Sequence, residues 1–140
     1  MKKWLAVSRV ANYVSSAIEC LASEDPGRTD QFRGALERAV LAAHDAVLAR
    51  AATSQALHGM ATTLTLMIST WPHAYVVQVG DSRCYYWNED GLQCMTHDQT
   101  VAQDLVDAGM LPPERAADSP LANVLSSALG GDEARPAVSS

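Results

Sequence analysis

Hydrophobic positions near the start of the chain recur every three or four residues, which is the period of an amphipathic helix. One such stripe covers residues 4–21 and a second covers residues 32–47, and turn-forming residues fill the segment 23–28 between them. Thr29 or Asp30 stands where it can cap the second helix. The pattern predicts two antiparallel helices, each with one apolar face that another part of the protein must cover.

The pattern then changes to an alternation with a period of two, which is typical of β-strands. It predicts strands over residues 61–69 and 74–79, followed by strands over 83–87 and 92–95. The polar segment 88–91 ends in Asp-Gly, which favours a hairpin. We expect one antiparallel meander whose first strand, apolar on both faces, is interior.

A third helix is expected to begin after Thr100, because Thr100 and Gln103 have the spacing of a capping box. Gly109 is expected to end it in a left-handed conformation. Its predicted inward residues are Val101, Leu105 and Ala108. Residues 112–114 have the form of a helix start, and the apolar positions between 121 and 129 predict one more short helix.

These elements predict the α+β class, with an N-terminal antiparallel helix pair packed on the antiparallel β-meander and short helices after it. The chain has 140 residues, which is the size of a single domain. We assign the domain to residues 1–131 and the polar residues 132–140 to a C-terminal tail. Hydrophobic residues make up 48% of the chain, a fraction that argues against disorder.

The net charge and the cysteine content exclude some classes of function and cellular location. The net charge of -6 argues against a nucleic-acid partner, because such binding depends mainly on Lys and Arg. No apolar stretch approaches the ~18 residues that cross a bilayer, so we expect no membrane association. The cysteines Cys20, Cys84 and Cys94 are odd in number and form no C-x-x-C pair. They fit reduced thiols in a cytoplasmic protein.

Asp81 is the residue that local pattern selects as a candidate for chemistry. It follows Gly80 at the end of an apolar strand, where a carboxylate stays hydrated while its backbone is rigid. Mg²⁺ binds through one or two such carboxylates and keeps several waters. The alternative is that Asp81 only caps a turn. The four histidines have none of the spacings that place two metal ligands on one helix face.

Several short motifs follow one another along the second half of the chain. They are G-M-A-T-T-L at 59–64, V-Q-V-G-D-S-R-C-Y at 77–85, T-H-D-Q-T at 96–100, L-V-D-A-G-M at 105–110, P-L-A-N-V-L at 120–125 and A-L-G-G at 128–131. In this order they resemble the middle of the protein phosphatase 2C family, which are metal-dependent serine/threonine phosphatases. Besides Asp81, the residues that carry the resemblance are Gly59, Thr62, Thr63, Gly80, Ser82, Arg83 and Asp98.

The resemblance implies a partial α-β-β-α sandwich and Mg²⁺ or Mn²⁺ as the cofactor. It also implies hydrolysis of phosphoserine or phosphothreonine, in which a water that bridges two metal ions attacks the phosphoryl group. In the family, the Asp of the G-D-S-R motif is associated with an additional, weakly held metal. The resemblance therefore implies that role for Asp81.

The chain also departs from the family. The principal metal ligands and the phosphate-binding arginine of the family belong to elements before the first helix and near the C-terminus, which find no match between Met1 and Ser140. Ala61 replaces a glycine, and Gln99 replaces a histidine. Because each metal ion needs several fixed oxygens, we assign no catalytic residue and expect a domain truncated at both ends that is inactive alone.

Such a partial domain would have an uncovered sheet edge, which favours pairing with another chain. We expect a homodimer, since two-fold pairing is the commonest arrangement. A phosphoprotein or a polypeptide that completes the site are further partners to consider. Two alternatives stay open: a non-catalytic oligomeric or small-ligand-binding module on the same scaffold, and an unrelated α/β domain with chance motif matches.

Overall fold

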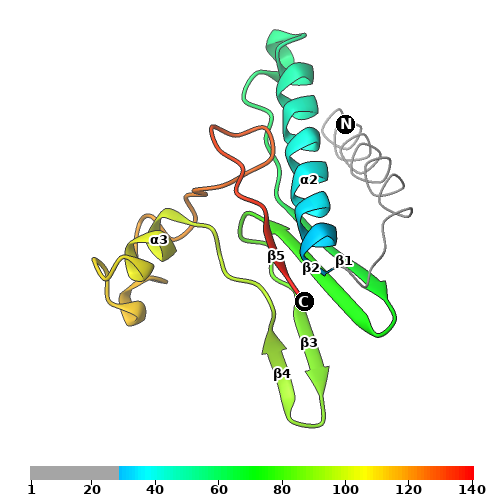
Figure 1. Ribbon diagram of the computed structural model, residues 1–140. Helices are drawn as coiled ribbons and strands as arrows, with labels where there is room; N and C mark the ends of the chain where they lie inside the picture. The colour runs from blue at the N-terminus through cyan, green and yellow to red at the C-terminus, as the bar shows by residue number, and fades with distance from the viewer. Residues whose placement is uncertain (1–28) are drawn as a thin grey trace.

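A computed structural model describes residues 29–140 of the chain, and Figure 1 shows the arrangement of their helices and strands. In chain order the elements are α2 (Thr29–Ala51), the 3-10 turn η1 (Gln55–Leu57), β1 (Leu64–Thr70), β2 (His73–Val79), β3 (Tyr85–Asn88), β4 (Gly91–Cys94), α3 (Val101–Asp107), the 3-10 turn η2 (Pro113–Arg115) and β5 (Ala137–Ser139). The predicted α+β class is confirmed. The helix predicted over residues 4–21, and with it the helix pair, lies outside the described residues.

Helix α2 buries the apolar stripe that its sequence predicts. The buried residues of that stripe are Phe32, Leu36, Val40, Ala43 and Val47. The buried strand residues in the same core are Tyr75, Val77 and Val79 of β2 and Val138 of β5. The rings of Phe32 and Tyr75 are tilted with their centroids 4.7 Å apart, a geometry that adds about 0.5–1.5 kcal/mol beyond simple burial. The core thus lies between α2 and one face of the sheet.

This sheet has three antiparallel strands in the order β1-β2-β5. Strand β5 falls within residues 132–140, which were expected to be a tail, and that expectation is wrong for Ala137–Ser139. Val138 pairs with Val77 and is 7% exposed. A strand of three residues with a single large apolar side chain has no period of its own, so only its pairing with β2 reveals it.

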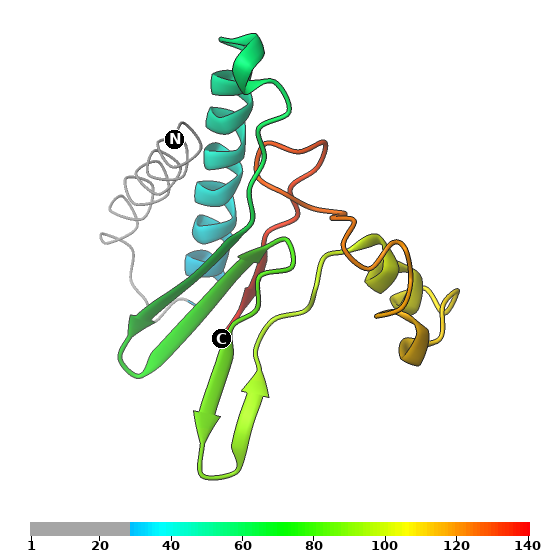
Figure 2. The same cartoon turned by 180° about the vertical axis from the view of Figure 1, so that it is seen from behind.

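Strands β3 and β4 form a separate two-stranded sheet, so the predicted four-stranded meander is wrong. Residues 80–84 leave the first sheet at the end of β2 and carry the chain into the hairpin. The predicted hairpin itself is confirmed, with Asn88 opposite Gly91 next to the turn and Trp87 opposite Leu92. Both views show this hairpin extending away from α2 (Figures 1 and 2).

Residues 100–125, here called the α3 lobe, project to one side of the first sheet and stand apart from it in both views (Figures 1 and 2). Thr100 caps α3 as expected, because its hydroxyl accepts a hydrogen bond from the Gln103 backbone N–H at 3.2 Å. Gly109 follows the helix with φ +70°. The helix buries Ala102, whereas Ala108, which was expected to face inward, is exposed.

The short helix predicted between residues 121 and 129 is wrong. Leu125 forms an isolated β-bridge with Thr100, and Leu129 forms another with Thr62. Leu129 is fully buried, while Val124 and Leu125 are 45% and 37% exposed. The spacing of these apolar residues would suit a helix, but the segment is irregular and partly extended. Its apolar side chains are divided between the core and the surface.

Candidate functional site

The G-D-S-R motif forms a tight corner, residues 80–83, directly after β2. Gly80 has φ +97°, and a Cβ on it would lie 2.4 Å from the Cγ2 atom of Thr63. A residue with a side chain would therefore be strained and would collide with the neighbouring segment. The glycine allows the chain to turn against Thr63, and this turn places Asp81 half-buried beside the end of the sheet.

Two threonines of the neighbouring segment, Thr63 of the first motif and Thr65 just after it, contact the corner. The hydroxyls of Thr63 and Ser82 are 2.8 Å apart, and the Thr65 hydroxyl donates to the Ser82 carbonyl oxygen at 2.7 Å. Thr62 exchanges two backbone hydrogen bonds with Leu129, of 3.0 and 2.9 Å. The structure thus brings together three motifs that are far apart in the sequence.

The remaining motif residues have structural partners. Arg83 donates two hydrogen bonds to the Asp98 carboxylate, from Nε to Oδ1 at 2.8 Å and from Nη2 to Oδ2 at 2.7 Å. The Asp98 carboxylate and then the Tyr85 hydroxyl raise the pKa of Arg83 above its ordinary value. Gly59 lies in the turn after η1 with φ +70°. The guanidinium of Arg83 is therefore fully charged and directed at Asp98.

Two glutamines that sequence reasoning did not select fix the corner from the other side. The buried Gln78 side chain donates to the Gly80 carbonyl at 2.9 Å and accepts from the His97 backbone N–H at 3.1 Å. The Gln99 side chain accepts from the Gly80 N–H at 2.8 Å and donates to the Arg135 carbonyl at 2.7 Å. The signal that could have identified Gln78 is its position as a polar residue between two valines of an apolar strand.

The described residues do not supply the donor set that two metal ions require. Within residues 29–140, no three His, Cys, Asp or Glu side chains are grouped so that they could bind a metal ion. Asp98 is already paired with Arg83. A two-metal centre therefore does not fit the described residues, because each ion requires several protein oxygens or bridging groups. One hydrated Mg²⁺ or Mn²⁺ ion at the half-buried Asp81 does fit, since such ions keep most of their waters.

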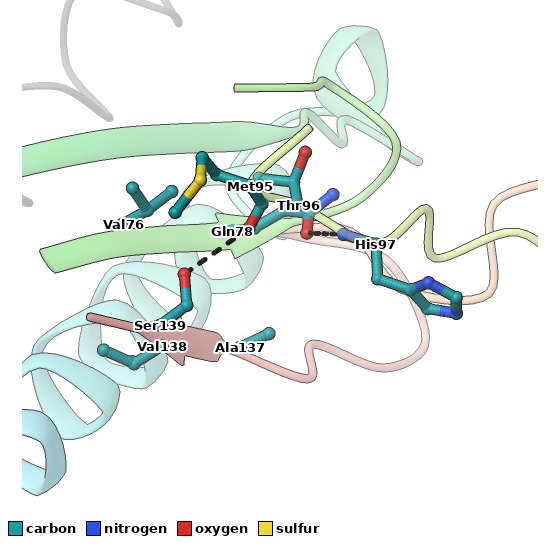
Figure 3. A pocket seen from close by; sticks show the side chains of 8 residues that line it. All are labelled: Val76, Gln78, Met95, Thr96, His97, Ala137, Val138 and Ser139. Carbon is teal, nitrogen blue, oxygen red and sulfur yellow. Dashed lines mark hydrogen bonds between the residues drawn. The ribbon is translucent and has the colours of Figure 1, made fainter. Parts of the chain in front are cut away.

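A shallow groove of about 150 Å³ lies on the face of the sheet opposite α2 (Figure 3). Its lining residues are Val76, Gln78, Met95, Thr96, His97, Ala137, Val138 and Ser139. Three separate segments of the chain form it, so the sequence alone could not indicate it. Asp81 does not line this groove.

Comparison with known proteins shows that the chain is similar to part of several bacterial serine/threonine phosphatases. It is 34% identical over 123 residues to the serine/threonine protein phosphatase PstP of Mycobacterium tuberculosis, a match that covers 88% of this chain and 24% of that protein. It is 30% identical over 95 residues to the serine/threonine phosphatase Stp of Listeria innocua, covering 68% of this chain and 38% of that protein. The chain thus spans well under half the length of these relatives. No protein-family model matches it.

Solved structures give the same picture for the fold. A crystal structure of the M. tuberculosis phosphatase PstP superposes with a TM-score of 0.74 at 32% identity, over 96% of this chain and 56% of that one. The catalytic domain of PstP in complex with two manganese ions superposes with a TM-score of 0.67 at 31% identity, over 94% and 54% of the two chains. The serine/threonine phosphatase of S. agalactiae reaches a TM-score of 0.79 at 21% identity, which supports the fold alone.

Proposed function

Because this chain resembles, in sequence and in fold, the central part of the protein phosphatase 2C family, we propose that it supplies one part of a site for metal-dependent hydrolysis of phosphoserine or phosphothreonine. The observation that carries the proposal is the G-D-S-R corner, in which Gly80 packs against Thr63 and presents Asp81. In this proposal the chain needs further ligands for catalysis, since residues 29–140 supply one unpaired carboxylate at the corner rather than a set of ligands.

Asp81 binds one Mg²⁺ or Mn²⁺ ion weakly in this proposal. A bound ion of this kind supplies positive charge that polarises a phosphoryl group and acidifies bound water. The chain's own contribution is to orient the carboxylate. The contact between Thr63 and Ser82 fixes the backbone on one side of Asp81. On the other side, the Gly80 carbonyl accepts from the Gln78 side chain and the Gly80 N–H donates to the Gln99 side chain.

Manganese binding can be measured directly by paramagnetic broadening of backbone amide NMR signals. We expect Mn²⁺ at millimolar or lower concentration to broaden the signals of residues 80–83 first. The substitution Asp81→Asn should abolish this broadening, because it removes the anionic oxygens. Asp90→Asn, in the exposed turn of the hairpin, is the matched control and should leave it unchanged. Broadening that survives Asp81→Asn, or that is strongest elsewhere, contradicts the assignment.

Activity is tested with a phosphothreonine peptide in the presence of Mn²⁺ or Mg²⁺. We expect the 140-residue chain to release no more phosphate than the metal alone. Metal-dependent turnover that disappears in Asp81→Asn would show instead that this polypeptide assembles a complete site.

A second candidate function is association without catalysis, and the β3–β4 hairpin favours it. Tyr85, Trp87 and Leu92 are 49%, 75% and 66% exposed. The register places these three side chains on one face of the hairpin, with Cys94 opposite Tyr85. Exposed apolar groups of this kind mark protein interaction sites. We assign this face to a homodimer, and a phosphoprotein or a completing polypeptide are the competing occupants.

Analytical ultracentrifugation tests the dimer. We expect a dimer at micromolar concentration that Trp87→Ser weakens. Tyr86→Ser is the matched control, because Tyr86 is 53% exposed but lies on the other face of the same hairpin. A monomer at these concentrations, or equal weakening by both substitutions, would overturn the dimer through this face.

The compartment is also a proposal. Among residues 29–140, no helix is both long enough and apolar enough to cross a bilayer. Cys84 and Cys94 are both free thiols. Free thiols are typical of reducing compartments, and they support a cytoplasmic location.

A further inference from the structure

The α3 lobe joins the rest of the protein through a narrow neck. The chain enters the lobe after Gln99 and leaves it at Ser126, and the Ser126 N–H donates to the Gln99 carbonyl at 3.0 Å. Next to this pair, Thr100 and Leu125 form an isolated β-bridge. The two crossing segments are therefore bonded to each other, so a movement of the lobe acts on Gln99 directly.

Gln99 uses its backbone and side chain to bond three different segments. Its backbone N–H donates to the Gly80 carbonyl at 3.2 Å, and its side-chain oxygen accepts from the Gly80 N–H at 2.8 Å. Its side-chain amide donates to the Arg135 carbonyl at 2.7 Å, in the segment that leads to β5. A primary amide can accept and donate at the same time. Gln99 therefore links the lobe, the corner before Asp81 and the segment before β5.

An ion pair and a histidine–carboxylate hydrogen bond connect α3 to the same region. The Arg135 guanidinium donates to the Asp104 carboxylate at 2.9 Å and also to the carbonyl of Ser126. His97, just before the neck, lies 2.7 Å from the Asp107 carboxylate. Asp104 and Asp107 are three residues apart, so both lie on the same side of the helix. The orientation of α3 is thus set by the side chains of Arg135 and His97, which lie near Gln99.

We propose that Gln99 is a positioning residue that couples the α3 lobe to the Gly80–Asp81 corner. The lobe is oriented by Arg135 and His97, and Gln99 transmits that orientation to the Gly80 backbone through its side-chain amide. The effect of this coupling on the affinity of Asp81 for a metal ion rests on the proposed function of Asp81. The coupling itself concerns only the conformation of the chain.

Amide hydrogen exchange of the full chain measures the coupling. Asp104→Ala removes the Arg135 ion pair without touching the corner. We expect it to accelerate exchange of the Gly80 amide about two- to fivefold, because opening of the lobe then opens the Gln99 contact more often. Exchange of the central β1 and β2 amides should stay unchanged, which separates the effect from global destabilisation. Asp118→Ala, an exposed acid elsewhere in the lobe, is the matched control and should change neither.

Two substitutions of Gln99 then separate its two side-chain contacts. Gln99→Met removes both, so exchange at Gly80 should rise and the apparent Kd for Mn²⁺ at Asp81 should increase. Gln99→Glu keeps an oxygen for the Gly80 N–H but loses the donor to the Arg135 carbonyl. Exchange at Gly80 should therefore rise less in Gln99→Glu than in Gln99→Met, and in the Gln99→Met background Asp104→Ala should no longer affect Gly80.

The exchange and metal-binding measurements test the coupling and the proposed function separately. Unchanged exchange at Gly80 in Asp104→Ala, or an effect that persists in the Gln99→Met background, overturns the coupling. If Mn²⁺ does not bind near Asp81 in the unaltered chain, the proposed function fails, while the exchange data still decide the coupling.

Discussion

The imidazole Nδ1 of His44 accepts a hydrogen bond of 3.1 Å from the backbone N–H of Gly130. This bond joins the middle of α2 to the last of the sequence motifs. Gly130 has φ +80° and packs against α2, so that a Cβ on it would lie 2.3 Å from Val47 Cγ1 and 2.5 Å from the Met60 carbonyl oxygen. The glycine is required because the chain passes between two segments at van der Waals contact.

Gly130→Ala should therefore destabilise the protein strongly. We expect a loss of about 2–4 kcal/mol in the free energy of unfolding, from left-handed backbone strain together with overpacking. Gly109→Ala is the matched control, because Gly109 has φ +70° but a Cβ on it would meet no atom within 4 Å. It should cost only about 1 kcal/mol. Urea denaturation measures both, and equal losses would show that the close approach is unimportant.

The core between α2 and the sheet can be tested with a matched pair of leucines in the helix. Leu36 is 1% exposed and Leu41 is 41% exposed. Leu36→Ala should cost about 2–5 kcal/mol, since it removes buried methyl groups and leaves a cavity. Leu41→Ala should change stability by about 0.5 kcal/mol or less. A similar cost for the two substitutions in thermal or urea unfolding would contradict the observed packing of α2.

The pair between Arg83 and Asp98 should contribute little to stability despite its good geometry. The Arg83 side chain is 53% exposed, so solvent screens the attraction. A double-mutant cycle with Arg83→Met and Asp98→Asn, in which each substitution removes the pair, should give a coupling free energy of about 0.2–1 kcal/mol. A coupling that does not fall at high salt would argue against an exposed ion pair.

The contact between His97 and Asp107 should appear as a dependence on acid pH. The hydrogen bond from His97, and secondly that from Gln103, lower the pKa of Asp107 from its ordinary value of 3.8. A lowered pKa in the folded state means that the contribution to stability is fully present above the ordinary value. It is lost as the pH falls through the lowered pKa of the folded protein.

Carbon-13 NMR titration of the Asp107 carboxyl measures this shift. His97→Gln should move the titration midpoint upward, toward the ordinary pKa. Gln103→Ala should move it in the same direction by less, because that hydrogen bond is the second cause. A midpoint unaffected by His97→Gln would mean that the two side chains do not interact in solution.

Local sequence patterns predicted the elements whose own residues carry the signal. The stripe from Phe32 to Val47 predicted α2, because burial of one helix face requires apolar residues at that period. Thr100 predicted the start of α3 through its cap. The prediction of a single four-stranded meander was wrong. The alternating pattern of β3 is common to all strands and does not indicate which strand pairs with it.

The candidate site shows the same division. Gly80 and Asp81 were selected from the sequence because a glycine and a carboxylate at a strand end form a recognisable unit. Gln78, Gln99 and Arg135 were missed, although all three bond to the corner or to one another. Polar residues of these types are common on surfaces, so their role is visible only when their partners are known.

Sequence alone determined the class of the fold, the helix stripe, the hairpin and the position of Asp81, because each depends on residues that are neighbours along the chain. Tertiary structure decided that β5 pairs with β2 and that Gly130 lies against His44. It also pairs Asp98 with Arg83, so that among residues 29–140 Asp81 is the carboxylate available at the corner. The physical reason is that hydrogen bonds and packing between distant segments depend on how the whole chain folds and which segments it brings into contact. A local period carries no information about that path.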